Sequence, residues 1–365
     1  MEGAGLERIV RAEDVAVMGI TEILLHIPRI YRSYRKLVRS IREQRPDVAV
    51  LIDFPDVNFR LAKHLHRAGV PVVWFVSPQL WAWKRRRLRW VQERVERMLV
   101  IFPFEEGFYR ARGVAVEFVG HPLATGTIPG GSRESFATAN GLDISKRWVA
   151  LLPGSRAKEV SANLFTMLQA AIVLAAEGEF EFVLPIASTL EMTWVEKQIE
   201  SWVERRRQFG GKPLPKLKLV REAREALSHA RASVVASGTA TVLAAVAGNP
   251  FVVVYRVSGM TFRLAKRLVR YPPEVDAEVD ADGNLPVAMV NLVAGRRLVP
   301  ELLNDRFTPS GVVSALRPLL EDGPEREKQV QGLAEVRSRL ASPGAGGGLG
   351  RVVGTVLDLL PRQPG

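Results

Sequence analysis

The stretch WVALLPGSRAKEV, residues 148–160, decides how the second half of this chain folds. An apolar run fit for one buried strand ends at Pro153 and Gly154, and a helical spacing of apolar residues follows. The turn between them leaves backbone N–H groups and a helix N-terminus exposed beside Ser155 and Arg156, an arrangement that favours a phosphate. An ordinary strand-to-helix turn with a solvated Arg156 explains this string alone somewhat better.

The same arrangement recurs in ASVVASGTATVL, residues 232–243, where a strand ends at Ser237-Gly238-Thr239 and a helix opens. A hydroxyl of Ser237 or Thr239 can cap that helix or bind a phosphate oxygen. Two such turns in one domain are better explained by a bound diphosphate than either turn is alone. The segments lack the Gly-x-Gly-x-x-Gly fingerprint, so we expect no nicotinamide or flavin cofactor.

A third candidate is VNLVAGRR, residues 290–297, where Asn291 and Gly295 could approach a nucleotide closely. A strand followed by a capped helix explains this segment equally well. The pattern predicts a strand near PVAMVNLV, alongside strands in FEFVLPI, LKLV, ASVVAS and PFVVVY.

Four apolar runs in the first half, residues 47–53, 70–77, 98–102 and 116–121, predict buried parallel strands joined by helices. Asp53 follows the first strand, where a carboxylate could act as general base towards an acceptor hydroxyl. Asp56 is expected only to cap the next helix. Together the two halves predict an α/β protein of GT-B type, with two Rossmann-like doubly wound domains facing a cleft.

Changes in composition and apolar patterning along the chain suggest four parts. We expect an N-terminal acceptor-side domain in residues 1–123, a linker in 124–146 and a C-terminal nucleotide-sugar domain in 147–343. Residues 344–365 form a glycine-rich joint and a terminal helix that can pack on the first domain.

The composition restricts the function. Without cysteine, the 365 residues contain no disulfide or thiolate metal site, and they contain no apolar run of membrane-spanning length and no signal peptide at their start. A cytosolic protein is expected. The net charge of +12 includes WKRRRLRW, residues 83–90, whose tryptophans and basic residues suit a membrane surface better than nucleic acid.

No metal is expected either. The five histidines are scattered, and His121 is the only one near a predicted cleft. The acidic segment 276–284 has the look of a calcium loop but lacks the ligand positions of an EF-hand, so an exposed loop is the better interpretation.

In their order along the chain, ten strings resemble the lipid-A-disaccharide synthase family over nearly the whole sequence. They are AVMGITEIL (16–24), PDVAVLIDFPDVN (46–58), SPQLWAW (77–83), FPFEEGFY (102–109), FVGHPL (118–123), LLPGSR (151–156), SGTAT (237–241), YR (255–256), LAKRLV (264–269) and NLVAGRRLVPELL (291–303).

The resemblance implies transfer of 2,3-diacylglucosamine from its UDP carrier to the 6-hydroxyl of 2,3-diacylglucosamine 1-phosphate. UDP and lipid A disaccharide 1-phosphate are released, and the enzyme associates peripherally with the inner face of the membrane. It implies that Asp53 is the base or an essential acceptor-site carboxylate. The implied nucleotide-sugar residues are Gly154, Ser155, Arg156, Ser237, Gly238, Thr239, Tyr255, Arg256, Asn291 and Gly295. The implied acceptor, lipid or membrane residues are Met18, Trp81, Trp83, Lys84, Arg85, Arg86 and Arg87.

Two departures from the family pattern stand out. The family opens with a strand and a Gly-Glu-Ala-Ser-Gly-Asp loop that this sequence does not contain, and we expect the assigned start to lie too far downstream; a truncated, inactive copy is the alternative. Leu243 stands where the family usually has a glutamate that bonds the ribose hydroxyls. A homologue that binds acylated sugar phosphate or membrane without catalysis therefore stays open, as do another GT-B enzyme such as a UDP-sugar epimerase and a homodimeric assembly.

Overall fold

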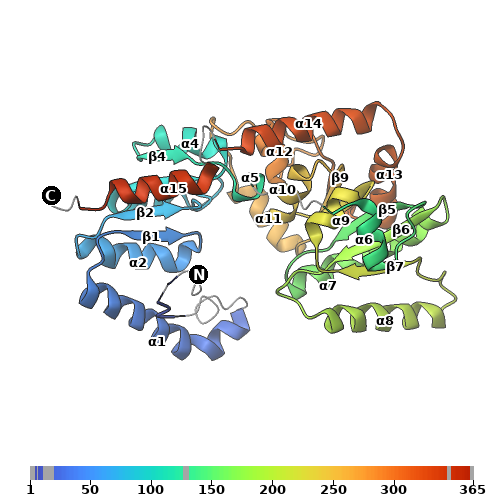
Figure 1. Ribbon diagram of the computed structural model, residues 1–365, viewed down its shortest axis with the longest axis horizontal. Helices are drawn as coiled ribbons and strands as arrows, with labels where there is room; N and C mark the ends of the chain where they lie inside the picture. The colour runs from blue at the N-terminus through green and yellow to red at the C-terminus, as the bar shows by residue number, and fades with distance from the viewer. Residues whose placement is uncertain (1–4, 6, 11–19, 126–130, 343–346, 362–365) are drawn as a thin grey trace. The chain divides into compact units, whose positions relative to one another are not determined.

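The computed structural model describes residues 5, 7–10, 20–125, 131–342 and 347–361. The chain divides into two compact units (Figure 1). Unit 1 comprises Met1–Gly120 together with Ser342–Gly365, and unit 2 comprises His121–Ala341.

Unit 1 contains a four-stranded parallel sheet in the order β1-β2-β3-β4. Its strands are β1 (Ala49–Ile52), β2 (Val72–Phe75), β3 (Arg97–Val100) and β4 (Val116–Phe118). Its helices are α1 (Ile20–Gln44), α2 (Pro55–Arg67), α3 (Leu88–Arg94), α4 (Pro103–Arg110) and α15 (Gly347–Asp358), with a 3-10 turn η3 (Arg85–Arg87). The four strands coincide with the four predicted apolar runs.

The strands of unit 1 differ in burial. The side chains of β2 and most of β3 are fully enclosed, as expected for parallel strands covered on both faces. β1 lies at one edge of the sheet, and its Val50 and Ile52 are exposed. In Figure 1 the terminal helix α15 lies beside these strands, and Arg351 on it donates a 2.8 Å hydrogen bond to Glu117 of β4.

Unit 2 contains a six-stranded parallel sheet in the order β10-β9-β8-β5-β6-β7. Its strands are β5 (Arg147–Leu152), β6 (Phe180–Pro185), β7 (Leu217–Val220), β8 (Ala232–Ala236), β9 (Phe251–Tyr255) and β10 (Glu301–Leu303). Its helices are α5 (Pro122–Thr125), α6 (Arg133–Asn140), α7 (Ala157–Ala175), α8 (Met192–Gln208), α9 (Ala223–His229), α10 (Thr239–Val246), α11 (Gly259–Leu268), α12 (Met289–Ala294), α13 (Pro309–Leu320) and α14 (Pro324–Leu340), with η4 (Asn304–Arg306).

The strand order of unit 2 reverses at β5, so this half is doubly wound as predicted. Strands β5, β6 and β7 run outward on one side, and β8, β9 and β10 run outward on the other. One apolar core lies between α7, α13 and the sheet, where Leu164, Phe182, Val234 and Leu316 are fully enclosed. In unit 1 the order does not reverse within the described residues, so the reversal predicted there is not seen.

The structure differs from two sequence-based predictions, one about the linker and one about a strand. The segment 124–146 is not a linker throughout, because α6 lies inside it and places Phe136 and Leu142 in a small core with Trp148. The apolar run PVAMVNLV forms α12 instead of a strand. Its valines and leucine suited either structure, and the short helix is buried on all sides before Gly295 ends it with φ +68°.

A buried carboxyl group supports the loop that follows β2. Glu105, at the start of α4, accepts hydrogen bonds from Ser77 Oγ (2.7 Å), Trp81 Nε1 (3.1 Å) and the Phe102 N–H (3.2 Å). Burial raises the pKa of Glu105 to about 7, although these hydrogen bonds oppose the rise. Glu105 therefore takes up a proton on folding at any pH between its unfolded and its folded pKa values.

This uptake predicts how stability depends on pH. The stabilisation from the neutral carboxyl group is complete below pH 4.5, its ordinary pKa, and is lost as the pH rises through about 7. The whole effect is about 3 kcal/mol. We expect Glu105→Gln to flatten this part of the unfolding free energy, measured by urea titrations from pH 4.5 to 8. An unchanged slope in the variant would show that Glu105 titrates normally.

Candidate nucleotide site

The loops predicted to hold a diphosphate lie side by side in unit 2. Strands β5 and β8 are neighbours in parallel register, with Leu152 opposite Val235. The Gly154 loop follows β5 immediately, and the Gly238 loop follows β8. The strand order reverses between these two strands, so both loops lie at the switch point, at the carboxyl edge of the sheet. Open α/β sheets bind their ligands at this position.

The loop after β5 presents anion-binding donors, and a carboxylate of the same chain binds them. Glu159 accepts hydrogen bonds from the Ser155 N–H (2.9 Å) and from Arg156 Nη1 (2.7 Å). No side chain caps α7 within the described residues, so its first N–H groups face the same place. Asn163 Nδ2 holds the Pro153 carbonyl at 2.9 Å and fixes the loop to the helix. The loop therefore already coordinates an anionic group.

The loop after β8 depends on glycine. Gly238 has φ +143° and ψ −159°, a region open essentially to glycine alone, and it precedes the first turn of α10. The Ser237 hydroxyl donates to the Val287 carbonyl at 3.3 Å, while Thr239 is exposed at the start of the helix. This turn offers backbone N–H groups and the Thr239 hydroxyl to a ligand.

The two residues after β9 have different roles. Tyr255 is part of the anion-binding surroundings: burial raises its pKa, and the nearby Glu159 carboxylate raises it further. Arg256 donates to the Ala162 carbonyl (3.0 Å), Thr166 Oγ1 (3.1 Å) and the Phe307 carbonyl (2.7 Å). Arg256 therefore joins the end of β9 to α7 and to Phe307, which follows η4, and in this conformation it positions the loop instead of facing a nucleotide.

Asn291 and Gly295 have structural roles in this conformation. The Asn291 side chain is fully buried; its Oδ1 accepts from the N–H groups of Leu298 and Val299 at 2.9 Å each, and its Nδ2 donates to Glu301 at 2.9 Å. With both ends of its amide engaged inside the protein, Asn291 supports α12 and cannot reach a ligand in this conformation. Gly295 ends α12, a structural role.

Sequence reasoning missed Glu301, the centre of that network. Its carboxylate also accepts from the N–H groups of Val287 (3.1 Å) and Ala288 (2.9 Å) and from Arg297 Nη1 (3.1 Å). Glu301 thereby fixes the two residues that precede α12, one of which, Val287, accepts a hydrogen bond from the Ser237 hydroxyl through its carbonyl. In the sequence, Glu301 lies within the apolar segment LVPELL, residues 298–303. No local pattern in that segment identifies the residues that Glu301 binds.

In unit 1, Asp53 lies just after β1 in a strained turn. Asp53 and Phe54 both have φ +44°, and Asn58 Nδ2 donates to the carbonyls of Ile52 (3.1 Å) and Asp53 (2.7 Å). Left-handed backbone at non-glycine residues is uncommon and concentrates at functional sites. After β2, Val76 has φ +64°, which is unusual for a β-branched residue. The Asp53 side chain is exposed.

Asp56 does not cap α2 as predicted. The residue at the N-cap is Phe54, and Asp56 lies in the first turn, where it pairs with Arg87 at 2.8 Å. The hydrogen bond from Arg87 holds the pKa of Asp56 below its ordinary value.

The two tryptophans predicted to line an acceptor or membrane surface differ in burial. Trp81 is buried and bonded to Glu105, so it belongs to the core, which contradicts its predicted role. Trp83 is 49% exposed, and Lys84 Nζ lies 4.0 Å from the centre of its ring. Arg85 and Arg86 are exposed beside it. Met18 lies outside the described residues.

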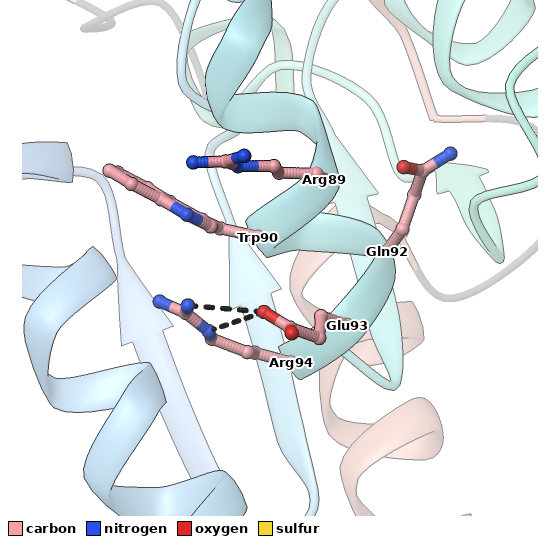
Figure 2. A pocket seen from close by; sticks show the side chains of 5 residues that line it. All are labelled: Arg89, Trp90, Gln92, Glu93 and Arg94. Atoms are coloured by element: carbon pink, nitrogen blue, oxygen red, sulfur yellow. Dashed lines mark hydrogen bonds and ion pairs between the residues drawn. The ribbon is translucent and has the colours of Figure 1, made fainter.

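The basic stretch continues into α3, where a shallow pocket of about 530 Å³ forms. Figure 2 shows Arg89 and Arg94 on either side of the Trp90 ring, with Arg94 also paired to Glu93. Their guanidinium carbons lie 6.0 and 5.4 Å from the centre of that ring. Arginines held in this way present a fixed, positively charged surface.

The remaining candidates are structural. His121 is buried in unit 2, where its Nδ1 accepts from the Leu123 N–H (3.1 Å), and burial lowers its pKa to about 4. In the acidic loop, Asp280 accepts from two backbone N–H groups of its own turn and pairs with Arg306, which also binds Asp282. Among the described residues, no three His, Asp or Glu side chains are grouped so that they could hold a metal ion.

Solved structures share this architecture. An S. aureus MnaA–UDP co-structure has a TM-score of 0.56 at 14% identity, covering 95% of this chain and 84% of its own. The calicheamicin glycosyltransferase CalG4 has a TM-score of 0.52 at 18% identity, covering 97% and 84%. The fold is therefore the GT-B type of glycosyltransferases and related epimerases.

The sequence comparisons are more specific. The model of the lipid-A-disaccharide synthetase family matches residues 1–342. Lipid-A-disaccharide synthase of Acidobacterium capsulatum is 50% identical over 100% of this chain and 88% of its own, and that of Koribacter versatilis is 47% identical over 94% and 83%. The chain belongs to the lipid-A-disaccharide synthase family. Of the helices that the structure describes, none has both the length and the apolar character to cross a bilayer.

The close approach of Gly154 to Glu159 yields a prediction. A Cβ at Gly154 would lie 2.5 Å from Glu159 Cβ and 2.7 Å from its Oε2, and φ is +130°. We expect Gly154→Ala to displace the Glu159 carboxylate and destabilise unit 2 by about 2–3 kcal/mol. Gly248→Ala is the control, because φ is +68° there but nothing lies within 4 Å of the added atom. Urea unfolding measures the stability of both variants; equal losses in the two would contradict the proposed steric contact.

Proposed function

We propose that this chain moves 2,3-diacylglucosamine from its UDP carrier to the 6-hydroxyl of 2,3-diacylglucosamine 1-phosphate, an inverting transfer that forms lipid A disaccharide 1-phosphate. The acceptor oxygen bonds to the anomeric carbon, the bond from that carbon to the UDP oxygen breaks, and the hydroxyl proton passes to a base. The observation that carries the proposal is the pair of anion-binding loops at the β5–β8 reversal in a chain of this family.

The diphosphate of UDP would use the donors of those two loops. Arg156 and the Ser155 N–H already bind a carboxylate, and Gly238 and Thr239 add backbone N–H groups from the neighbouring strand. Negative charge builds up on the leaving UDP as its bond to the sugar breaks. Fixed donors and a guanidinium stabilise such charge without a metal ion.

Asp53 is proposed as the base. Its carboxylate is exposed at the end of β1, and the strained turn is fixed by Asn58. The exposed Trp83, Lys84, Arg85 and Arg86 in the same unit would bind the inner face of the membrane, where an acylated acceptor resides. The protein would thus associate peripherally with the membrane while it catalyses the reaction. The proposed reaction uses no cofactor.

The test pairs each proposed residue with a similar residue elsewhere. With both acylated sugars in detergent, the purified chain should release UDP, and Asp53→Asn should lower kcat about one hundred to ten thousandfold. Because Asp53 is proposed to act on the acceptor hydroxyl and not on UDP, the affinity of the Asp53→Asn variant for UDP should stay unchanged. Asp56→Asn, which loses only the ion pair with Arg87, should keep most of the activity. Equal losses in both variants would contradict the role of Asp53.

Arg156→Ala should weaken UDP binding at least tenfold, the effect of a lost charged hydrogen bond. Arg207→Ala is its control, since Arg207 is an exposed arginine on α8 of the same unit. Absence of UDP release by the unmodified chain, with UDP binding intact, would favour a binding protein over the enzyme.

Leu243 gives an independent prediction. It is half-buried in α10, four residues after Thr239, and cannot accept a hydrogen bond from ribose. We expect Leu243→Glu to tighten UDP binding by about one order of magnitude, because a charged hydrogen bond to the ligand is gained. Leu243→Gln should give a smaller gain, and neither should change affinity for inorganic pyrophosphate. A similar gain with pyrophosphate would place the effect away from the ribose.

A further inference from the structure

Helix α11 has an apolar face that its own unit does not cover. Met260, Leu264 and Leu268 are 75%, 55% and 64% exposed. They recur every four residues, so they form one stripe along the helix. Exposed apolar side chains are ordinary when scattered, but three in one stripe of a ten-residue helix form a contiguous patch.

A different side of α11 contacts the rest of unit 2. Phe262, Ala265 and Val269 are the less exposed residues of this segment, and their spacing of three and four places them on a second stripe. At 100° per residue, that stripe is centred more than a quarter-turn away from Met260, Leu264 and Leu268. The exposed stripe therefore contributes nothing to the core of unit 2.

The flank of the exposed stripe is basic. Arg263, Lys266 and Arg267 are exposed, and residues 259–270 contain no acidic residue. An apolar stripe beside a row of cations, on a helix with a strongly polar remainder, is the pattern of helices that lie in the surface of an anionic bilayer. A protein partner would equally need acidic groups to face these cations, and a bilayer supplies them as lipid phosphates along the whole helix.

Another exposed stripe shows the contrast. Leu349, Val353 and Leu357 of α15 are also exposed and recur every four residues. The only basic residue of α15 is Arg351, which is bonded to Glu117. That stripe lacks charge complementarity to lipid, so exposure of apolar residues alone does not single out α11.

The position of α11 connects it to the nucleotide site. The helix starts three residues after Arg256, at the carboxyl edge of the sheet, and Ser258 caps it by accepting from the Thr261 N–H at 3.1 Å. Between α11 and η4 lies a pocket of about 590 Å³, lined in part by Val257, Phe262 and Phe307. Membrane contact at α11 would therefore bring the proposed nucleotide edge of unit 2 to the lipid surface.

We propose that α11 is an interfacial membrane helix: Met260, Leu264 and Leu268 enter the acyl region of an anionic bilayer, and Arg263, Lys266 and Arg267 bind the lipid phosphates. The inference deepens the proposed function, on which it rests, because it gives the nucleotide-binding unit its own contact with the membrane that holds the acylated donor. It is separate from the basic stretch around Trp83 in unit 1.

The test measures binding of the full chain to vesicles without substrates. The probes are vesicles of phosphatidylglycerol with phosphatidylcholine, and vesicles of phosphatidylcholine alone. The triple change Met260→Ser, Leu264→Ser and Leu268→Ser should lower affinity for the anionic vesicles about tenfold or more. Changing Arg263, Lys266 and Arg267 to Gln should lower it about fivefold for each residue, and only when phosphatidylglycerol is present.

Phe209→Ser is the matched control, because Phe209 is 89% exposed beside the arginines of α8, at the amino edge of the sheet. It should leave vesicle binding unchanged. Circular dichroism and the thermal midpoint show that the variants fold. UDP release from the detergent-dissolved sugars should be the same in the triple variants as in the unmodified chain.

Unchanged vesicle binding in both triple variants would overturn the proposal, as would an equal loss in Phe209→Ser. Loss of self-association by light scattering, with vesicle binding intact, would assign α11 to a second copy of the chain and also overturn it. If the unmodified chain releases no UDP in detergent, the proposed function fails, while the vesicle experiment still reports on α11 independently.

Discussion

The parallel pairing of β5 with β8 is the constraint on which the nucleotide site depends. These two strands are distant in sequence, separated by two complete strand–helix units, yet they end side by side in register. Each must then pass into a helix, and the two connections leave the sheet in opposite directions. The donors of both loops thus lie at the same edge of the sheet, and the apolar core below keeps both strand ends fixed.

Three carboxylates, two in unit 2 and one in unit 1, hold loops of their own unit by accepting hydrogen bonds from backbone or side-chain donors. Glu159 binds the β5 loop, Glu301 binds the start of α12, and Glu105 binds the loop after β2. Of these, Glu105 and Glu301 are buried. A buried acceptor that serves several donors ties chain segments together more tightly than one apolar contact, because leaving any of its partners unbonded is costly.

The fold was predictable because its strands are short apolar runs and its turns contain glycine or proline. VPVVWFVS and FEFVLPI could be recognised without their neighbours, and both loops at the β5–β8 reversal were found from Gly154 and Gly238. The helical structure of α12 could not be predicted, since a fully enclosed short helix and a buried strand have the same composition. Trp81 and Trp83 are two residues apart, and only the fold shows that one points into the core. Asn291 was selected as a candidate from its place in the sequence. Its partners, Glu301 and the turn at Leu298, depend on tertiary contacts that no local pattern records.

The carboxylate of Glu159 has a consequence for turnover. In the proposed site, a phosphate of UDP and this carboxylate would require the same N–H and the same guanidinium, so the affinity for UDP would be a difference between two anions and not the full strength of either. Once the sugar has left, the internal anion can displace the spent nucleotide stepwise, donor by donor. In the proposed cycle the chain itself would thereby limit product retention, and Glu159 would keep the charge of Arg156 paired between turnovers.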